Sequence, residues 1–165
     1  MIKYQNKSID LILKENNWTD PEIRNFFAFL DMISYAEGTN RFGDQHGYNV
    51  IVGGSTFKDY SRHPNKLIKL NAKLSSTAAG RYQILYRFWT HYSKLLNLPD
   101  FSPLSQDLYV LQILKEQRAL DAVRKGDIKT AIERCANIWA SFPNAGYGQR
   151  EVKMNDLLKY HESRL

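Results

Sequence analysis

The chain has a single cysteine and no long hydrophobic run. Because Cys135 has no partner, an internal disulfide is excluded, and the chain fits a reducing compartment. No stretch reaches the ~18 consecutive apolar residues that indicate a transmembrane helix. The first ten residues interrupt their apolar side chains with charge, so they lack the core of a signal peptide. These absences predict a protein that is made soluble in a cytoplasm.

The sequence also lacks the common patterns of metal and cofactor sites. Its four histidines show no HExxH or comparable ligand spacing, and one cysteine cannot complete a thiolate site. Cys135 lies among Ile132, Ala136 and Trp139, which predicts a small core residue and not a nucleophile. We expect neither a metal nor a cofactor.

Composition predicts one globular domain with a basic surface. Hydrophobic residues make up 43% and charged residues 24% of the 165 residues, and a chain of this length can bury ~70% of its unfolded surface. Lys and Arg number 23 against 17 Asp and Glu, for a net charge of +6. Nucleic acid, an anionic membrane surface and an acidic cell wall all fit this charge, which alone does not choose among them.

Periodicity predicts a helix, then a small β patch, then several helices. Thr19 and Glu22 form a capping box, and apolar residues follow at helical spacing until Gly38, so the first helix should end at Glu37. Short strands are predicted at 48–52, 55–57 and 67–70, with a small-residue loop at 75–80. Further helices are predicted at 81–96, 102–118, 119–125, 127–140 and 151–162. The expected fold class is α+β, mostly helical with segregated antiparallel strands.

Glu37 is the most informative residue of the sequence. It continues the apolar stripe of Ile23, Phe26, Leu30 and Ile33, so an ionisable side chain stands where an apolar one belongs. Burial and the negative end of its own helix would both raise the pKa of Glu37. A carboxylic acid that stays protonated near neutral pH can protonate the leaving oxygen of a glycoside. The alternative is a helix-end glutamate that points into water or pairs with a nearby Lys or Arg.

No second carboxylate is fixed by spacing. Asp31 lies six residues before Glu37, about 240° around the helix, and therefore faces elsewhere. Asp44 and Asp59 lie in or beyond the β patch and could reach across a cleft. Acidic residues in such positions are more often solvated loop side chains than catalytic partners, and this is the alternative for both.

Three tyrosines lie in or beside loops rich in Gly, Asn, Gln or Ser, namely Tyr48, Tyr82 and Tyr147. Aromatic faces with nearby amides suit sugar rings, and the candidate amides are Asn49, Gln83 and Asn137. The alternatives are tyrosines that pack turns, or a surface that stacks nucleic-acid bases. Because the basic residues are scattered and not gathered on one face, nucleic acid is the weaker alternative.

Taken together, these stretches resemble the phage lambda lysozyme (endolysin) family of peptidoglycan lytic transglycosylases. The resemblance covers roughly residues 26–160 in family order. The matching stretches are Phe29–Thr39, His46–Gly54, Ser76–Gln83 and Asn137–Gln149.

The resemblance implies a lysozyme-like fold with a cleft, formed by residues 19–165 as one catalytic domain, with residues 1–18 as an extension of unknown role. It implies cleavage of the MurNAc–GlcNAc bond of peptidoglycan glycan strands to leave a 1,6-anhydro sugar. Its single catalytic glutamate maps onto Glu37, and its substrate-binding stretches contain Tyr48, Asn49, Tyr82, Gln83, Asn137 and Tyr147. The family often carries an acid where this chain has Asn49, which puts a carboxylate role there in doubt.

The resemblance also implies a monomer that binds neither nucleic acid nor, stably, a membrane. It would wait in the host cytoplasm until a separate membrane-permeabilising protein releases it to the wall. Two alternatives stay open. One is a hydrolytic lysozyme that pairs Glu37 with Asp44 or Asp59, and the other is a non-catalytic module that binds cell wall or nucleic acid.

Overall fold

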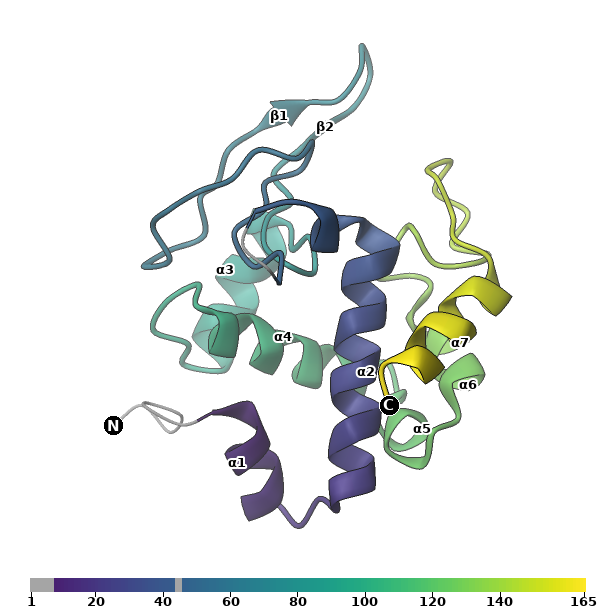
Figure 1. The fold of residues 1–165 in the computed structure, drawn as a ribbon. Helices are drawn as coiled ribbons and strands as arrows, with labels where there is room; N and C mark the ends of the chain where they lie inside the picture. Colours follow the sequence, from purple (N-terminus) through teal and green to yellow (C-terminus); the bar gives the residue numbers. More distant parts are fainter. Residues whose placement is uncertain (1–7, 44–45) are drawn as a thin grey trace. The chain divides into compact units, whose positions relative to one another are not determined.

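The computed structural model describes residues 8–43 and 46–165, and these form two compact units (Figure 1). Unit 1 comprises Gly38–Tyr109, and unit 2 comprises residues 8–37 and Val110–Leu165. The division falls inside one helix, between Tyr109 and Val110. Residue 18, the predicted end of the extension, lies within unit 2, and the single catalytic domain over 19–165 stays a prediction.

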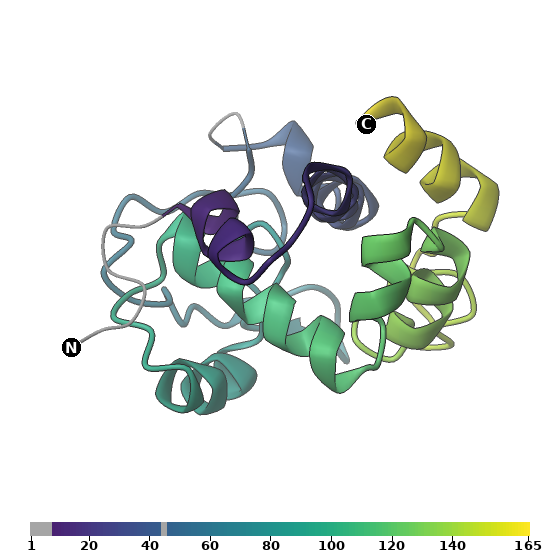
Figure 2. The ribbon, with the colours of Figure 1, turned by 90° about the horizontal axis from the view of Figure 1, so that it is seen from below.

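Unit 2 is built around helix α2, Asp20–Glu37. The predicted capping box is present, since the Thr19 backbone N–H donates to Glu22 Oε2 at 2.8 Å, and Gly38 follows with a left-handed φ of 75°. The four apolar residues of the predicted stripe are all buried. Helices α5, Leu120–Lys125, and α7, Met154–Ser163, pack against α2, and α6, Ile128–Cys135, contacts both of them (Figure 2).

The extension contains a helix that the sequence pattern did not predict. Helix α1, Ile9–Glu15, buries Ile9, Ile12 and Leu13. Just after it, the Trp18 ring lies edge-on to Phe26 at 5.7 Å between centroids, and the Arg124 guanidinium stacks on the Trp18 ring at 4.7 Å. The segment from residue 8 to residue 18 is therefore part of the folded unit.

Unit 1 carries the small β structure. Strands β1, Ile68–Lys69, and β2, Ser75–Ser76, form an antiparallel pair with Ile68 opposite Ser76. The short 3₁₀ helix η1, Thr39–Arg41, precedes them, and α3, Tyr86–Leu95, follows. Helix α4, Pro103–Glu116, begins in this unit and crosses into unit 2. The predicted α+β class, mostly helical with a segregated antiparallel pair, is confirmed.

Several predicted boundaries were wrong. Residues 48–52 and 55–57 form only isolated bridges, such as Val50 with Thr56, and Ser75–Ser76 is a strand inside the predicted loop. Helix α3 begins at Tyr86 and not at 81, because the chain turns at Gln83, whose φ of 50° is left-handed. Helix α6 ends at Cys135 and not near 140, with Cys135 itself fully buried as predicted. No helix among the described residues is both long and apolar enough to cross a bilayer.

Candidate active site

Glu37 is the last residue of α2 and lies partly buried in unit 2. Ser141 donates its hydroxyl to Glu37 Oε1 at 3.0 Å. The Arg150 guanidinium donates to the carbonyl of Ala36 at 2.9 Å, which places a positive charge beside the carboxylate. Helix α2 places Glu37 at its end, and the environment of the carboxyl is supplied by Ser141 and Arg150, which lie more than 100 residues later in the chain.

Burial dominates the electrostatics of this carboxyl and raises the pKa of Glu37 to about 7. The Ser141 hydrogen bond and the Arg150 charge both act in the opposite direction, because each favours the ionised form. The sequence-based prediction of a pKa raised by burial is confirmed. A group with this pKa can donate a proton and later accept one near neutral pH.

The loop after α6 is fixed by aromatic packing and by backbone hydrogen bonds. The Phe142 ring packs against Trp139 and Phe29, with centroids 5.4 and 6.5 Å away, and anchors the neighbouring Ser141. Glu151 accepts from the backbone N–H groups of Asn144 and Gly146 at 2.8 and 3.1 Å. These contacts hold Ser141 against Glu37.

The structure joins two predicted substrate residues in this same loop. Tyr147 is 55% exposed, and its hydroxyl donates to the backbone carbonyl of Asn137 at 2.8 Å. The Asn137 side chain is exposed. The tyrosine ring therefore presents an open face beside a free amide, as a sugar-binding surface requires.

In unit 1, two predicted tyrosines converge on a buried carboxylate. Tyr82 donates to Asp107 Oδ1 at 2.5 Å, and Tyr48 donates to the same carboxylate at 2.9 Å. The Arg81 guanidinium lies over both rings, 5.2 Å from the Tyr48 centroid and 5.7 Å from that of Tyr82. Burial and the neighbouring Asp107 raise the pKa of both phenols, so both stay protonated donors.

Burial separates the roles of these tyrosines. Tyr48 is partly exposed, whereas Tyr82 is 1% exposed. The direct sugar contact expected of Tyr82 is therefore not available in this conformation, because its whole ring is enclosed. Tyr82 instead packs edge-on against Tyr48, with ring centroids 6.2 Å apart, and supports it.

The amides of Gln83 and Asn49 lie in turns of the same unit. Gln83 Nε2 donates to the carbonyls of Gly80 and Val50 at 3.0 and 3.4 Å, which leaves its Oε1 as the end available to a hydroxyl. The Asn49 side chain packs over Gly43, where an added Cβ would lie 2.1 Å from Oδ1. A side chain at Gly80 would likewise meet Gln106 Oε1 at 2.4 Å, so this turn requires glycine.

The candidate second acids have other partners where they are described. Asp31 accepts from Arg164 Nε at 2.9 Å. Asp59 accepts from the Ser61 backbone N–H at 2.8 Å, and hydrogen bonds from Ser61 hold the pKa of Asp59 below its ordinary value. Asp44 lies outside the described residues. Within 8–43 and 46–165, no three His, Cys, Asp or Glu residues cluster in a way that could hold a metal.

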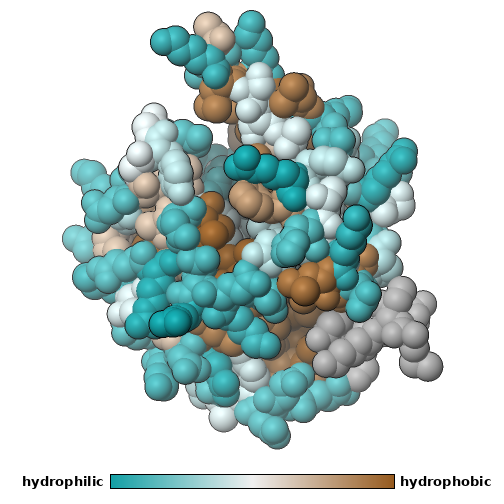
Figure 3. Space-filling view, turned by 180° about the vertical axis from the view of Figure 1, so that it is seen from behind, coloured by the Kyte–Doolittle hydropathy of each residue, from teal (hydrophilic) through white to brown (hydrophobic). Residues whose placement is uncertain are grey.

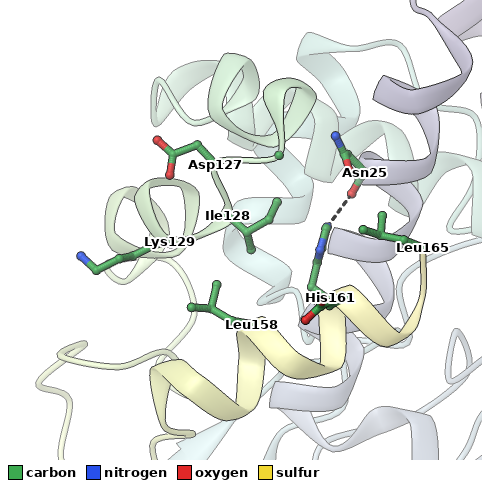
Figure 4. Close-up of a pocket in the computed structure, with 9 residues that line it drawn as sticks. Asn25, Asp127, Ile128, Lys129, Leu158, His161 and Leu165 are labelled. Atoms are coloured by element: carbon green, nitrogen blue, oxygen red, sulfur yellow. Dashed lines mark hydrogen bonds between the residues drawn. The ribbon is translucent and has the colours of Figure 1, made fainter.

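A cavity of about 370 Å³ also lies in unit 2, between α2, the start of α6 and α7 (Figure 4). His161 is buried at its edge, and its Nε2–H donates to the carbonyl of Asn25 at 3.1 Å. None of the predicted site residues lines this cavity.

Comparisons with known proteins decide the family. A family model described as Endolysin matches residues 27–165. The chain is 56% identical over 140 residues to the endolysin of Escherichia phage lambda, a match that covers 82% of this chain and 89% of the relative. It is 49% identical over 148 residues to the endolysin of Escherichia phage P2, with the same coverage. The chain belongs to the endolysin family.

Two solved structures that resemble this endolysin point to the same family. Bacteriophage lambda lysozyme complexed with a chitohexasaccharide matches with a TM-score of 0.84 and 53% identity, over 86% of this chain and 94% of that chain. A second structure of lysozyme from bacteriophage lambda matches with a TM-score of 0.80 and 51% identity, over the same shares of the two chains. The predicted lysozyme-like fold and endolysin family are confirmed, and the relatives support the coarser prediction of a peptidoglycan-cleaving glycosidase.

Sequence reasoning missed three residues that lie beside predicted site residues within their own units: Ser141, Arg150 and Asp107. Asp107 could have been found, because it stands three residues before Val110 and seven before Leu114 on a buried helical stripe. This is the same signal that pointed to Glu37. Ser141 and Arg150 gave no such signal, since both lie in or beside a loop without periodicity.

Proposed function

We propose that this endolysin cleaves the MurNAc–GlcNAc β-1,4 bond of peptidoglycan by lytic transglycosylation, leaving 1,6-anhydro-MurNAc ends. The observation that carries the proposal is the buried carboxyl of Glu37, with a pKa of about 7 and one hydrogen-bond donor, Ser141. The glycan bound in the related lambda lysozyme structure supports a polysaccharide substrate.

In this reaction Glu37 acts first as an acid and then as a base. Its proton passes to the glycosidic oxygen as the bond from that oxygen to C1 of MurNAc breaks. The resulting carboxylate then takes the proton of the C6 hydroxyl, whose oxygen closes onto C1. Glu37 ends protonated, as it began, and no water enters. A pKa near 7 suits both roles, because donor and acceptor forms are then both accessible.

Transglycosylation needs no second carboxylate, whereas an inverting hydrolase needs one to activate water and a retaining one uses it as nucleophile. Asp31 forms an ion pair with Arg164, and Asp59 accepts a hydrogen bond within its own turn. These contacts favour transglycosylation over hydrolysis. We assign sugar positioning to Tyr48, Gln83 and Tyr147, with Asn49 and Asn137 as hydrogen-bonding amides and Tyr82 as the support of Tyr48.

The product distinguishes the two reactions. Purified sacculi are digested and the muropeptides are separated and weighed by mass spectrometry. Transglycosylation gives anhydro-MurNAc ends, one water lighter than hydrolytic ends. Reducing-end MurNAc alone would show hydrolysis, and binding to sacculi without loss of turbidity would show a non-catalytic module.

We further propose that the enzyme acts as a monomer, binds neither nucleic acid nor a membrane stably, and stays in the host cytoplasm until a separate protein opens the membrane. The lack of a membrane-spanning helix among the described residues is compatible with this route. The enzyme added outside intact host cells should not lyse them, and permeabilising the inner membrane of cells that express it should.

A further inference from the structure

One long segment of this chain carries basic residues and no acidic ones. Between residues 60 and 99 the sequence has seven Lys and Arg and no Asp or Glu. The hairpin, residues 66–76 with strands β1 and β2, lies inside this segment. This segment therefore gives unit 1 a local excess of positive charge.

Three lysines of the hairpin, Lys66, Lys69 and Lys73, are exposed. The structure joins none of the three to a carboxylate of the described residues. By contrast, unit 2 pairs Arg124 with Glu22 at 2.9 Å. In the space-filling view, the hairpin stands at the top, with hydrophilic side chains beside hydrophobic ones (Figure 3). Exposed cations on one short hairpin create a local positive potential that attracts an anionic partner.

We propose that these hairpin lysines bind the acidic peptide stems of peptidoglycan. This inference rests on the proposed function and names the part of the substrate that the basic surface recognises. Each MurNAc carries its stem peptide on the lactyl group, and the stem contains free carboxylates of glutamate and of the diamino acid that follows it. A glycan strand therefore presents anionic groups along its whole length.

The choice of lysine supports a flexible carboxylate-bearing partner. Lysine is a point charge on a flexible chain, so it can follow carboxylates whose positions vary from stem to stem. Arginine, with its rigid fork, is the usual residue for fixed bidentate contacts to phosphate, and none lies between Lys66 and Lys73. The exposed side chains of Leu67, Leu70 and Leu74 would instead favour a lipid surface, which the experiment tests separately.

The test compares Lys66→Gln/Lys69→Gln/Lys73→Gln with a matched variant of three exposed unit 2 lysines, Lys115→Gln/Lys125→Gln/Lys159→Gln. Each is assayed on intact sacculi and on glycan strands from which an amidase has removed the stems. The hairpin variant should raise KM on intact sacculi about ten-fold, since it removes three exposed ion pairs, each of which contributes modestly. KM on stripped strands, and kcat on both substrates, should change less than about two-fold.

The matched variant should leave both substrates unaffected, and Lys→Arg changes at the three hairpin positions should restore KM. Equal losses on intact and stripped strands, or no loss on either, would overturn the proposal. Loss of binding to phosphatidylglycerol vesicles with unchanged KM on sacculi would assign the lysines to a membrane and overturn it as well. Failure of the transglycosylase proposal is seen separately, in the mass of the product ends.

Discussion

The two units of this endolysin divide its net charge very unequally. In the sequence, residues 38–109 contain nine Lys and Arg against four Asp and Glu, whereas residues 8–37 and 110–165 contain twelve against thirteen. Unit 1 thus carries +5 and unit 2 carries −1, and Lys3 and Lys7, which lie outside the described residues, supply the rest of the +6. Glu37, the proposed catalytic acid, belongs to the nearly neutral unit and the surplus charge to the other, so substrate attraction and acid chemistry should respond to different mutations.

The buried polar groups differ in the same way. Unit 2 holds one carboxyl, Glu37, with a raised pKa of about 7, which makes it ready to exchange a proton. Unit 1 encloses Asp107 with two phenol donors and the neighbouring Arg81 guanidinium, an arrangement that fixes the positions of the two tyrosine rings. Glu37 accepts a hydrogen bond from neutral Ser141 and has the Arg150 charge nearby, and burial still outweighs both, which suits proton exchange, whereas an acid enclosed by several donors is suited to positioning.

The largest effect should come from Glu37→Gln. This change keeps the size of the side chain and removes its proton transfer, so kcat should fall by about 100- to 10 000-fold. Binding to sacculi, measured by co-sedimentation, should keep its sensitivity to salt because unit 1 is unchanged. Near-full turbidity loss by the variant would contradict the assignment of Glu37.

A smaller effect is expected from Asp107→Asn. Loss of the charge weakens both phenol hydrogen bonds and the contact with Arg81, so Tyr48 should be held less firmly and KM should rise about ten-fold. The value of kcat should change little, because Glu37 belongs to the other unit. Tyr82→Phe, which removes one of the two donors and keeps its ring, should give a weaker rise. A drop in kcat at constant KM would show that Asp107 acts on the chemistry instead.

The smallest effect is a displaced pH profile in Ser141→Ala. The Ser141 hydroxyl stabilises the ionised carboxylate, so removing it should raise the pKa of Glu37 further. The protonated form then persists to higher pH, and the alkaline limb of the kcat profile should move up by about 0.5–1 pH unit. Ser163→Ala, which removes an exposed hydroxyl at the end of α7, is the control. A limb that moves down would show that Ser141 stabilises the protonated acid.

Local patterns in the sequence predicted much of the fold and the main catalytic candidate. The capping box at Thr19 and the stripe from Ile23 to Ile33 predicted α2 correctly, since both signals act within a few turns of one helix. They also placed Glu37 at a buried helix end. Where the pattern failed, as at Gln83, the cause was a left-handed turn whose side chain bonds to the nearby carbonyl of Gly80 and the distant carbonyl of Val50.

The sequence by itself determined the α+β class, the main helices, the excess of positive charge and the position of the acid. Tertiary structure alone decided that Ser141 contacts Glu37 across 104 residues of chain. It also decided that Tyr82 is enclosed while Tyr48 stays partly exposed. Periodicity reports which face of one element is buried, whereas hydrogen-bond partners and enclosure depend on which other elements fold against it.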